Sequence, residues 1–166
     1  MRLVVTDANI IIDLDAGSLL EEIFRLPNTE FCTPDVLYLE ELAQHYGALP
    51  GLGLKVLSQP PESVEYVTQL RPRYRGPSTN DLFALALAHS LGCALLSGDG
   101  SLRTAADSEG VEIHGTLWLI EALLQANLVP IARIVAAYDA MRWDGSRLPW
   151  EAIQAQIRRW QGIDPR

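Results

Sequence analysis

The chain has 166 residues, 48% of them apolar, and carries 21 acidic against 13 basic side chains for a net charge of −8. This length and apolar content predict one compact domain with a single core, and they exclude a largely disordered chain. The negative charge excludes nucleic-acid binding by bulk electrostatics alone, although acids gathered around metal ions would reverse the local field.

Short apolar runs alternate with helical patterns along the first half of the chain. In order, we expect a strand at 2–6, a short turn packed under the sheet at 10–14, a helix at 18–26, a strand at 31–33, a helix at 34–46, a loop at 47–53 and a strand at 54–57. Thr33 should be the N-cap of the helix at 34–46, and Pro34 its first residue.

The same alternation continues through the second half of the chain. We expect a helix at 60–70, a basic loop at 71–77, a helix at 81–91, a strand at 93–97, a short helix at 101–108, a strand at 111–113 and helices near 116–126, 130–142 and 149–161. Strands that alternate with helices predict a short parallel sheet with helices on both faces, a three-layer α/β/α fold.

The chain shows no domain-length linker. We expect residues 1–125 to form the α/β domain, and residues 126–166 to form helices that pack on it or extend it. Trp143, Trp150 and Trp160 should pack against the domain or against a partner. Cys32 and Cys93 lie in apolar stretches and should be reduced thiols of a cytoplasmic protein. No apolar run reaches the ~18 residues of a membrane helix, and Met1–Leu3 leads straight into a strand, so neither a membrane span nor an export signal is expected.

Three aspartates occupy positions where an α/β fold gathers its ligands. Asp7 and Asp99 close two strands, and Asp81 stands in the first turn of a helix. Because parallel strands lead out at the same edge of the sheet, these carboxylates can converge there. Carboxylates packed together repel and raise one another's pKa, and hard cations such as Mg²⁺ or Mn²⁺ remove that conflict.

A fourth acid would come from the pair Glu40 and Glu41. Adjacent residues point about 100° apart on a helix, so only one of the two can face the site. The helix start at Pro34 favours Glu40, whereas the local apolar pattern favours Glu41, and the sequence does not separate them. Each acid also has an ordinary structural interpretation as a helix cap, a turn residue or an exposed helix face.

The order and spacing of several stretches resemble the PIN-domain family, which includes toxin ribonucleases of bacterial and archaeal toxin–antitoxin pairs. The similar stretches are Val5–Asn9, Thr33–Leu42, Asn80–Ala88, Leu95–Arg103 and Gly110–Leu119. In that family, three or four acids bind Mg²⁺ or Mn²⁺ and cleave RNA. The resemblance therefore implies that Asp7, Asp81, Asp99 and one of Glu40 and Glu41 are metal ligands and catalytic residues, and that Asn9 and Ser97 orient ligands or water. It also implies a restraining antitoxin protein and a homodimer.

Basic residues suggest where RNA would lie. Arg71, Arg73 and Arg75 precede Asp81 on one loop, with Tyr74 between them as a possible stacking surface. A solvated polar loop is the alternative interpretation. Arg103 either pairs with a nearby acid or reaches a phosphate.

Two other functions fit parts of the pattern. Asp7 followed by Asn9 also resembles haloacid-dehalogenase phosphatases, in which the first Asp is the nucleophile. Those enzymes need a second acid at the position of Asn9 and a Lys before the last motif, and the only lysine is Lys55, far upstream. A non-catalytic scaffold with a PIN-like fold is the third possibility.

Overall fold

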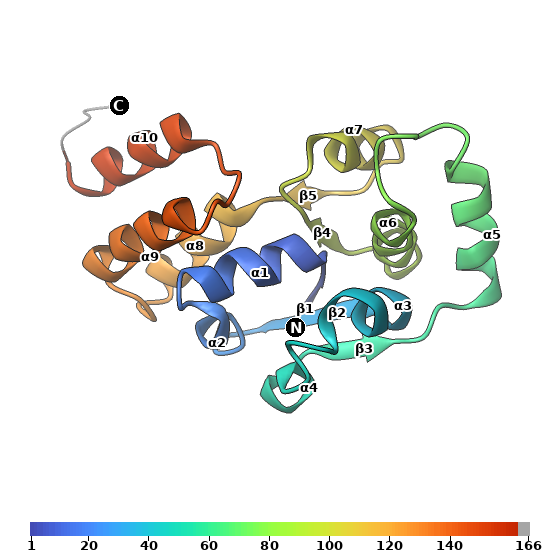
Figure 1. Ribbon diagram of the computed structural model, residues 1–166, viewed down its shortest axis with the longest axis horizontal. Helices are drawn as coiled ribbons and strands as arrows, with labels where there is room; N and C mark the ends of the chain where they lie inside the picture. The colour runs from blue at the N-terminus through green and yellow to red at the C-terminus, as the bar shows by residue number, and fades with distance from the viewer. Residues whose placement is uncertain (163–166) are drawn as a thin grey trace.

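The computed structural model describes residues 1–162 and contains a five-stranded, fully parallel sheet between layers of helices (Figure 1). The strands are β1 (Arg2–Thr6), β2 (Thr29–Pro34), β3 (Lys55–Leu57), β4 (Ala94–Leu96) and β5 (Ile113–His114). Their order across the sheet is β3-β2-β1-β4-β5. The chain thus builds outward from β1 on one side and then returns to build the other side from β4. The predicted three-layer α/β/α fold is confirmed.

The central strands are apolar along their length because helices cover both faces of the sheet. Every residue of β4 is buried, as are Val4 and Val5 of β1. Helix α6 (Thr79–Leu91) crosses one face in contact with β1, β2 and β4. Helices α1 (Ala8–Ala16), α2 (Leu20–Ile23) and α8 (Thr116–Gln125) lie on the opposite side (Figure 1).

The other helical segments surround these layers. They are α3 (Asp35–Leu37), the π-helical turn η1 (Tyr38–Leu42), α4 (Leu49–Leu52), α5 (Pro61–Leu70), α7 (Gly100–Ser108), α9 (Ile131–Trp143) and α10 (Trp150–Trp160). Helix α5 packs on α6, α9 packs on α1, and α10 packs on α9. The predicted division at residue 125 stays a prediction, and residues 163–166 of the expected 126–166 extension lie outside the described residues.

The turn predicted at 10–14 is wrong, because these residues belong to helix α1. Asp7 is the N-cap of this helix, and its side chain accepts a hydrogen bond from the Ile10 amide. Ile10, Ile11 and Leu14 are buried at helical spacing. The helical period was not visible in the sequence, because Ile12 is apolar although it lies on the exposed face of the helix.

Further expectations needed correction. Of the helix predicted at 18–26, only Leu20–Ile23 is an α-helix; Ser18, with a positive φ of 57°, lies in the turn that follows the Gly17 C-cap of α1. The helix predicted at 34–46 is shorter and changes to a π-helical turn, in which the Ala43 amide donates to the Tyr38 carbonyl at 2.7 Å. Its N-cap is Pro34 and not Thr33, which belongs to β2, so Pro34 is not the first helical residue. The loop predicted at 47–53 contains α4.

The tryptophans of the C-terminal helices differ in their environments. Trp150 and Trp160 are half-buried against the core. Trp143 does not pack against the domain, because it is 94% exposed. Its packing against a partner stays a prediction.

Candidate active site

The acids lie where the sheet order reverses, between β1 and β4. The Asp7 amide donates to the Leu96 carbonyl at 3.1 Å, so the carboxyl ends of the two strands are held together. Asp7 follows β1 directly, and Ser97, Gly98 and Asp99 follow β4. A reversal of strand order at the carboxyl edge is where open α/β sheets place their ligand sites.

Asp7 is a buried carboxylate with only one of its oxygens in use. Its Oδ1 accepts from the Ile10 amide at 2.9 Å, whereas its Oδ2 has no hydrogen-bond partner among residues 1–162. The side chain is 2% exposed. Burial raises the pKa of Asp7 to about 7; the neighbouring Ser97 hydroxyl and the Ile10 amide act against this rise, and the charges of Asp81 and Asp13 add to it.

Asp81 and Asp99 are anchored in the same manner. In the capping box of α6, the Ser78 amide donates to Asp81 Oδ2 at 2.9 Å, and the Asp81 amide donates to Ser78 Oγ at 3.0 Å. In α7, the N-cap Asp99 accepts from the Leu102 amide at 2.9 Å and from the Ser101 hydroxyl through Oδ1. These hydrogen bonds, that of Ser101 foremost, lower the pKa of Asp99. Each aspartate therefore caps a helix with one oxygen, and no hydrogen bond to residues 1–162 occupies its other oxygen.

The two glutamates of η1 flank Asn80. The Asn80 amide donates to Glu40 Oε2 at 2.8 Å. The pKa of Glu41 is raised by burial, lowered by hydrogen bonding to Asn80, and raised again by the charges of Asp81 and Glu40. The charge of Glu41 therefore interacts with that of Asp81.

The acids are linked in pairs and do not form a closed cluster. Asp7 interacts with Asp81, and Asp81 with Glu41. Within the part of the chain that the structure describes, no three acidic, His or Cys side chains are close enough together to hold one metal ion. Asp99 lines a neighbouring cavity.

That cavity measures about 530 Å³ and has a mainly polar lining. Its walls include Asn9, Asp13, Asp99, Ser146 and Arg147. Asn9 and Asp13 share one face of α1, four residues apart. Burial raises the pKa of Asp13, while a hydrogen bond from Ser146 lowers it. Asp13 was missed by the sequence analysis because residues 10–14 were interpreted as a turn; a helix that begins after Asp7 would have placed it beside Asn9.

Ser97 connects the two acidic turns. It is fully buried, and its Oγ accepts from the Asp99 amide at 3.1 Å. Its hydroxyl also lowers the pKa of Asp7, so Ser97 interacts with both acidic turns. Asn9, in contrast, is exposed at the rim.

The basic loop before Asp81 is held by its own contacts. Arg71 donates to the carbonyls of Tyr74 and Pro77 at 2.8 and 2.7 Å. Arg73 pairs with Glu109 at 3.2 Å, and the Tyr74 hydroxyl donates to the same carboxylate at 2.7 Å. Arg75 is exposed and has no ion pair among residues 1–162. Arg103 lies in a different cavity, beside Gly115.

Comparison with known families settles the membership of the chain. A family model described as a PIN domain matches residues 3–162. The chain belongs to the PIN-domain family. The match includes all of α9 and α10, so these helices lie inside the region that the family model describes.

Solved structures share this PIN-domain fold at low sequence identity. One is a PilT N-terminus domain protein from the archaeon Sulfolobus solfataricus, with a TM-score of 0.52 and 16% identity over 75% of this chain and 93% of that chain. Another is VapBC2 from Rickettsia felis bound to a DNA fragment from their promoter, with a TM-score of 0.50 and 12% identity over 69% of this chain and 98% of that chain. Among curated proteins, the PIN-domain chain has no match. None of the helices described for residues 1–162 is long and apolar enough to cross a membrane.

Proposed function

We propose that this PIN-domain protein is a metal-dependent endoribonuclease. The observation that carries the proposal is the Asp7 carboxylate, which is buried at the carboxyl edge with Oδ2 left without a partner. An ionised carboxylate in such a position is costly unless a cation compensates it. The membership in the PIN-domain family supports the same conclusion.

The donor types at this edge suit a hard divalent cation, although the carboxylates would have to draw closer together to share one ion. All the candidate ligands are carboxylates, the donor set that Mg²⁺ and Mn²⁺ prefer. Asp7, Asp81 and Asp99 each retain one carboxylate oxygen that no hydrogen bond to residues 1–162 occupies. A bound divalent cation would supply polarisation of the phosphodiester and activation of water. The capping bonds to backbone amides would hold each carboxylate in position, and Ser97 would fix Asp7 relative to the Asp99 turn.

Glu41 is the better choice for the fourth ligand. Its charge interacts with that of Asp81 and burial raises its pKa, whereas the Asn80 amide contacts both glutamates and does not separate them. We therefore expect Glu41→Gln to lower cleavage by about 10²-fold, as loss of a metal ligand or its support does. Glu40→Gln, a matched change one residue away, should stay within a few-fold of the original chain. Equal losses in both variants would contradict this assignment.

The biological role that we infer is the toxin of a toxin–antitoxin pair. A cytoplasmic ribonuclease needs restraint, and an antitoxin segment that brings an Arg or Lys to the acids would compete with the metal. The solved Rickettsia felis VapBC2 assembly was bound to promoter DNA, and the likeness of fold supports a similar pairing here. We also expect a homodimer. Sedimentation of a monomer at micromolar concentration would count against it.

The decisive experiment is cleavage of labelled RNA in Mn²⁺ and in EDTA. We expect cleavage only with metal, and its loss in Asp7→Asn. Asp139→Asn, which changes an exposed acid on α9, is the control and should cleave normally. Hydrolysis of a small phosphomonoester without RNA cleavage would instead favour the phosphatase alternative, which the PIN-domain match does not support. Binding of RNA without any cleavage would favour a scaffold.

A further inference from the structure

A second cavity adjoins the acidic one. It measures about 570 Å³ and lies between the end of β5, the start of α8 and the connection from α9 to α10. Gly98 and Arg147 line both cavities, so the two hollows share a wall. An extended chain bound at the carboxylates can continue into this second cavity.

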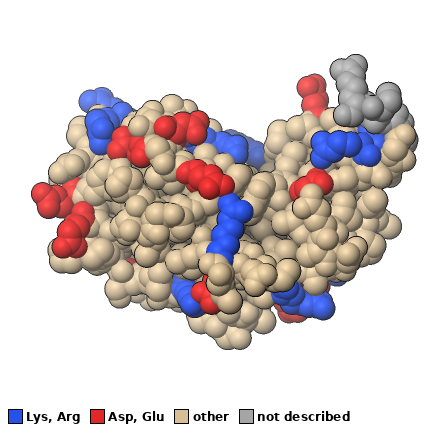
Figure 2. Space-filling view, turned by 180° about the vertical axis from the view of Figure 1, so that it is seen from behind, with Lys and Arg blue, Asp and Glu red and all other residues tan. Residues whose placement is uncertain are grey.

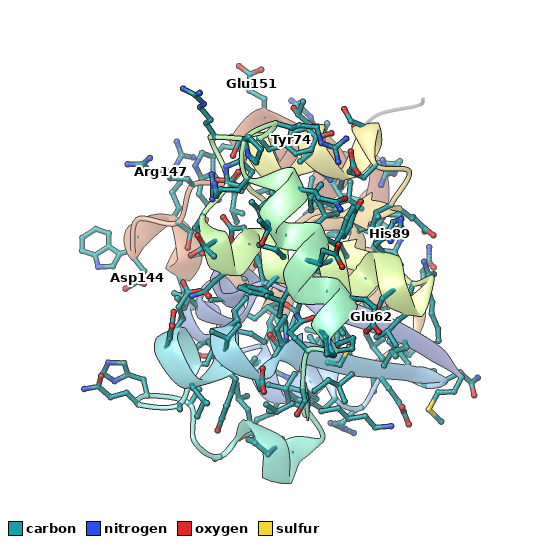
Figure 3. All side chains as sticks on the ribbon, turned by 90° about the vertical axis from the view of Figure 1, so that its right-hand side faces the viewer. Glu62, Tyr74, His89, Asp144, Arg147 and Glu151 are labelled. Carbon is teal, nitrogen blue, oxygen red and sulfur yellow. The ribbon has the colours of Figure 1, made fainter. Side chains whose placement is uncertain are left out.

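Two arginines in this cavity lack acidic partners. Arg103 and Arg147 form no ion pair among residues 1–162, although acids outnumber bases in the chain by 21 to 13. Figure 3 shows Arg147 on the same side of the molecule as Asp144, at the α9–α10 connection. On the face seen in Figure 2, acidic and basic side chains are interspersed, and no broad basic patch is visible there.

The start of α8 lies against the same cavity. Gly115 is the N-cap and offers no side-chain hydrogen bond, so the first amides of the helix lack a cap. Thr116 lines the cavity at 2% exposure, and its hydroxyl has no partner among the described residues. A Cβ at Gly115 would be 3.7 Å from Arg103 Nη2, which places the guanidinium beside the helix start.

These groups together have the chemistry of a phosphate site. An uncapped helix start presents amide hydrogens and partial positive charge to an anion, and arginine offers a fork that matches phosphate oxygens. The Trp118 ring in the cavity wall is already stacked on His114, with centroids 4.3 Å apart, and Arg2 lies over it at 4.9 Å. The cavity therefore suits a phosphate, for which it has hydrogen-bond donors, better than a nucleotide base, for which it has no free aromatic face.

We propose that this cavity binds an RNA backbone phosphate next to the phosphodiester held at the carboxylates. Arg103 and Arg147 supply the charge, and the α8 amides with the Thr116 hydroxyl supply the remaining donors. The subsite rests on the ribonuclease function proposed above. It also explains how a chain with net charge −8 can hold a polyanion near its acids.

The first test measures phosphate binding without RNA or metal. Inorganic phosphate is titrated into the isotope-labelled protein, and the amide signals of Thr116 and Leu117 and the Trp118 indole signal are followed by NMR. We expect saturable shifts at these groups, weakened about tenfold in Arg103→Gln or Arg147→Gln. Arg158→Gln, which removes an exposed arginine of α10 with no ion pair among residues 1–162, should keep the shifts. The absence of saturable shifts in the original chain would overturn the proposal.

The second test measures binding of a short single-stranded RNA in Ca²⁺ across a series of KCl concentrations. Loss of one phosphate contact should lower the slope of log K against log salt by about 0.7 in each cavity variant. Slopes equal to that of Arg158→Gln would overturn the subsite while leaving normal Mn²⁺-dependent cleavage, and thus the ribonuclease function, intact. If the original chain binds phosphate here but neither binds nor cleaves RNA, the ribonuclease function fails and the RNA assignment of the subsite fails with it.

Discussion

Each aspartate at the sheet edge divides its two oxygens between two tasks. Asp7 and Asp99 cap α1 and α7 with Oδ1, and Asp81 closes the capping box of α6 with Oδ2. Cap bonds of this kind stabilise a helix by about 1 kcal/mol each and fix the carboxylate direction at the same time. The structural and the catalytic interpretations of these acids are therefore compatible. At Asp7, however, the second oxygen is buried without a partner, and ionisation there has a cost.

That cost predicts a pH-dependent stability in the absence of metal. The pKa of Asp7 is raised from 3.8 to about 7, so between these values the unfolded state releases a proton that the folded state retains. Stability should fall as pH rises through this window, by up to about 4 kcal/mol. Asp7→Asn keeps a capping oxygen without the charge, and should be more stable than the original chain at pH 8 in EDTA.

Urea unfolding at pH 5 and pH 8 measures this difference. The exposed Asp139→Asn should follow the original chain at both pH values. Addition of Mg²⁺ at pH 8 should stabilise the original chain and leave Asp7→Asn unchanged. Parallel pH profiles for the original chain and Asp7→Asn would refute the electrostatic account.

At the scale of elements, strand positions and acid positions were predictable, and local helix geometry was not. The apolar runs that predicted β1 and β4 are followed by Asp7 and Asp99. At the carboxyl edge of the sheet, each of these buried parallel strands is followed by a polar N-cap that begins the next helix. The π-helical turn that carries Glu40 and Glu41 has no sequence signature, so the direction of each of these adjacent glutamates could not be predicted. Asp13 and Arg147 join the site through packing of α9 on α1, across more than a hundred residues of chain.

One contact between elements positions the loop that leads to Asp81. Glu109, just after α7, accepts from the hydroxyls of Tyr66 and Tyr74 and pairs with Arg73. Burial raises the pKa of Glu109, but the hydrogen bonds from Tyr66 and Tyr74 and the charge of Arg73 lower it by more. The pKa of Glu109 therefore lies below its ordinary value. The stabilisation is thus present above pH 4.5 and is lost as pH falls below that value.

Glu109→Gln should therefore loosen loop 71–77. Loss of the charged acceptor should cost about 1–3 kcal/mol of stability at neutral pH. Hydrogen exchange in residues 71–77 should become faster, and cleavage should decrease because the capping box at Ser78 and Asp81 begins where this loop ends. Glu65→Gln, an exposed change on α5, is the control. Unchanged exchange in the loop would show that Glu109 does not hold it.

At the scale of the whole molecule, the C-terminal helices complete the edge of the sheet. Helix α9 approaches α1 closely at Gly17, where a Cβ would be 2.6 Å from Met141 Cε. Helix α10 is fixed by buried Gln156, which accepts from the Tyr138 hydroxyl at 2.7 Å and donates to the Leu117 carbonyl at 3.1 Å. One side chain thus ties α10 to α8 and α9. The connection that carries Arg147 is held between two anchored helices.

Gln156→Leu should release α10 without disturbing the carboxylates. The change leaves the buried Tyr138 hydroxyl without its partner and removes the bonds to the Leu117 carbonyl and Glu121 Oε2, at a cost of about 2 kcal/mol. Hydrogen exchange should increase across 144–160, while α1 and α6 keep their protection. Because the connection contributes Arg147 and not a metal ligand, KM for RNA should rise several-fold with kcat nearly unchanged. Gln154→Leu, an exposed change on the same helix, should do neither. A fall in kcat at constant KM would mean that α10 supports the carboxylates themselves and that the RNA-binding role of the connection is wrong.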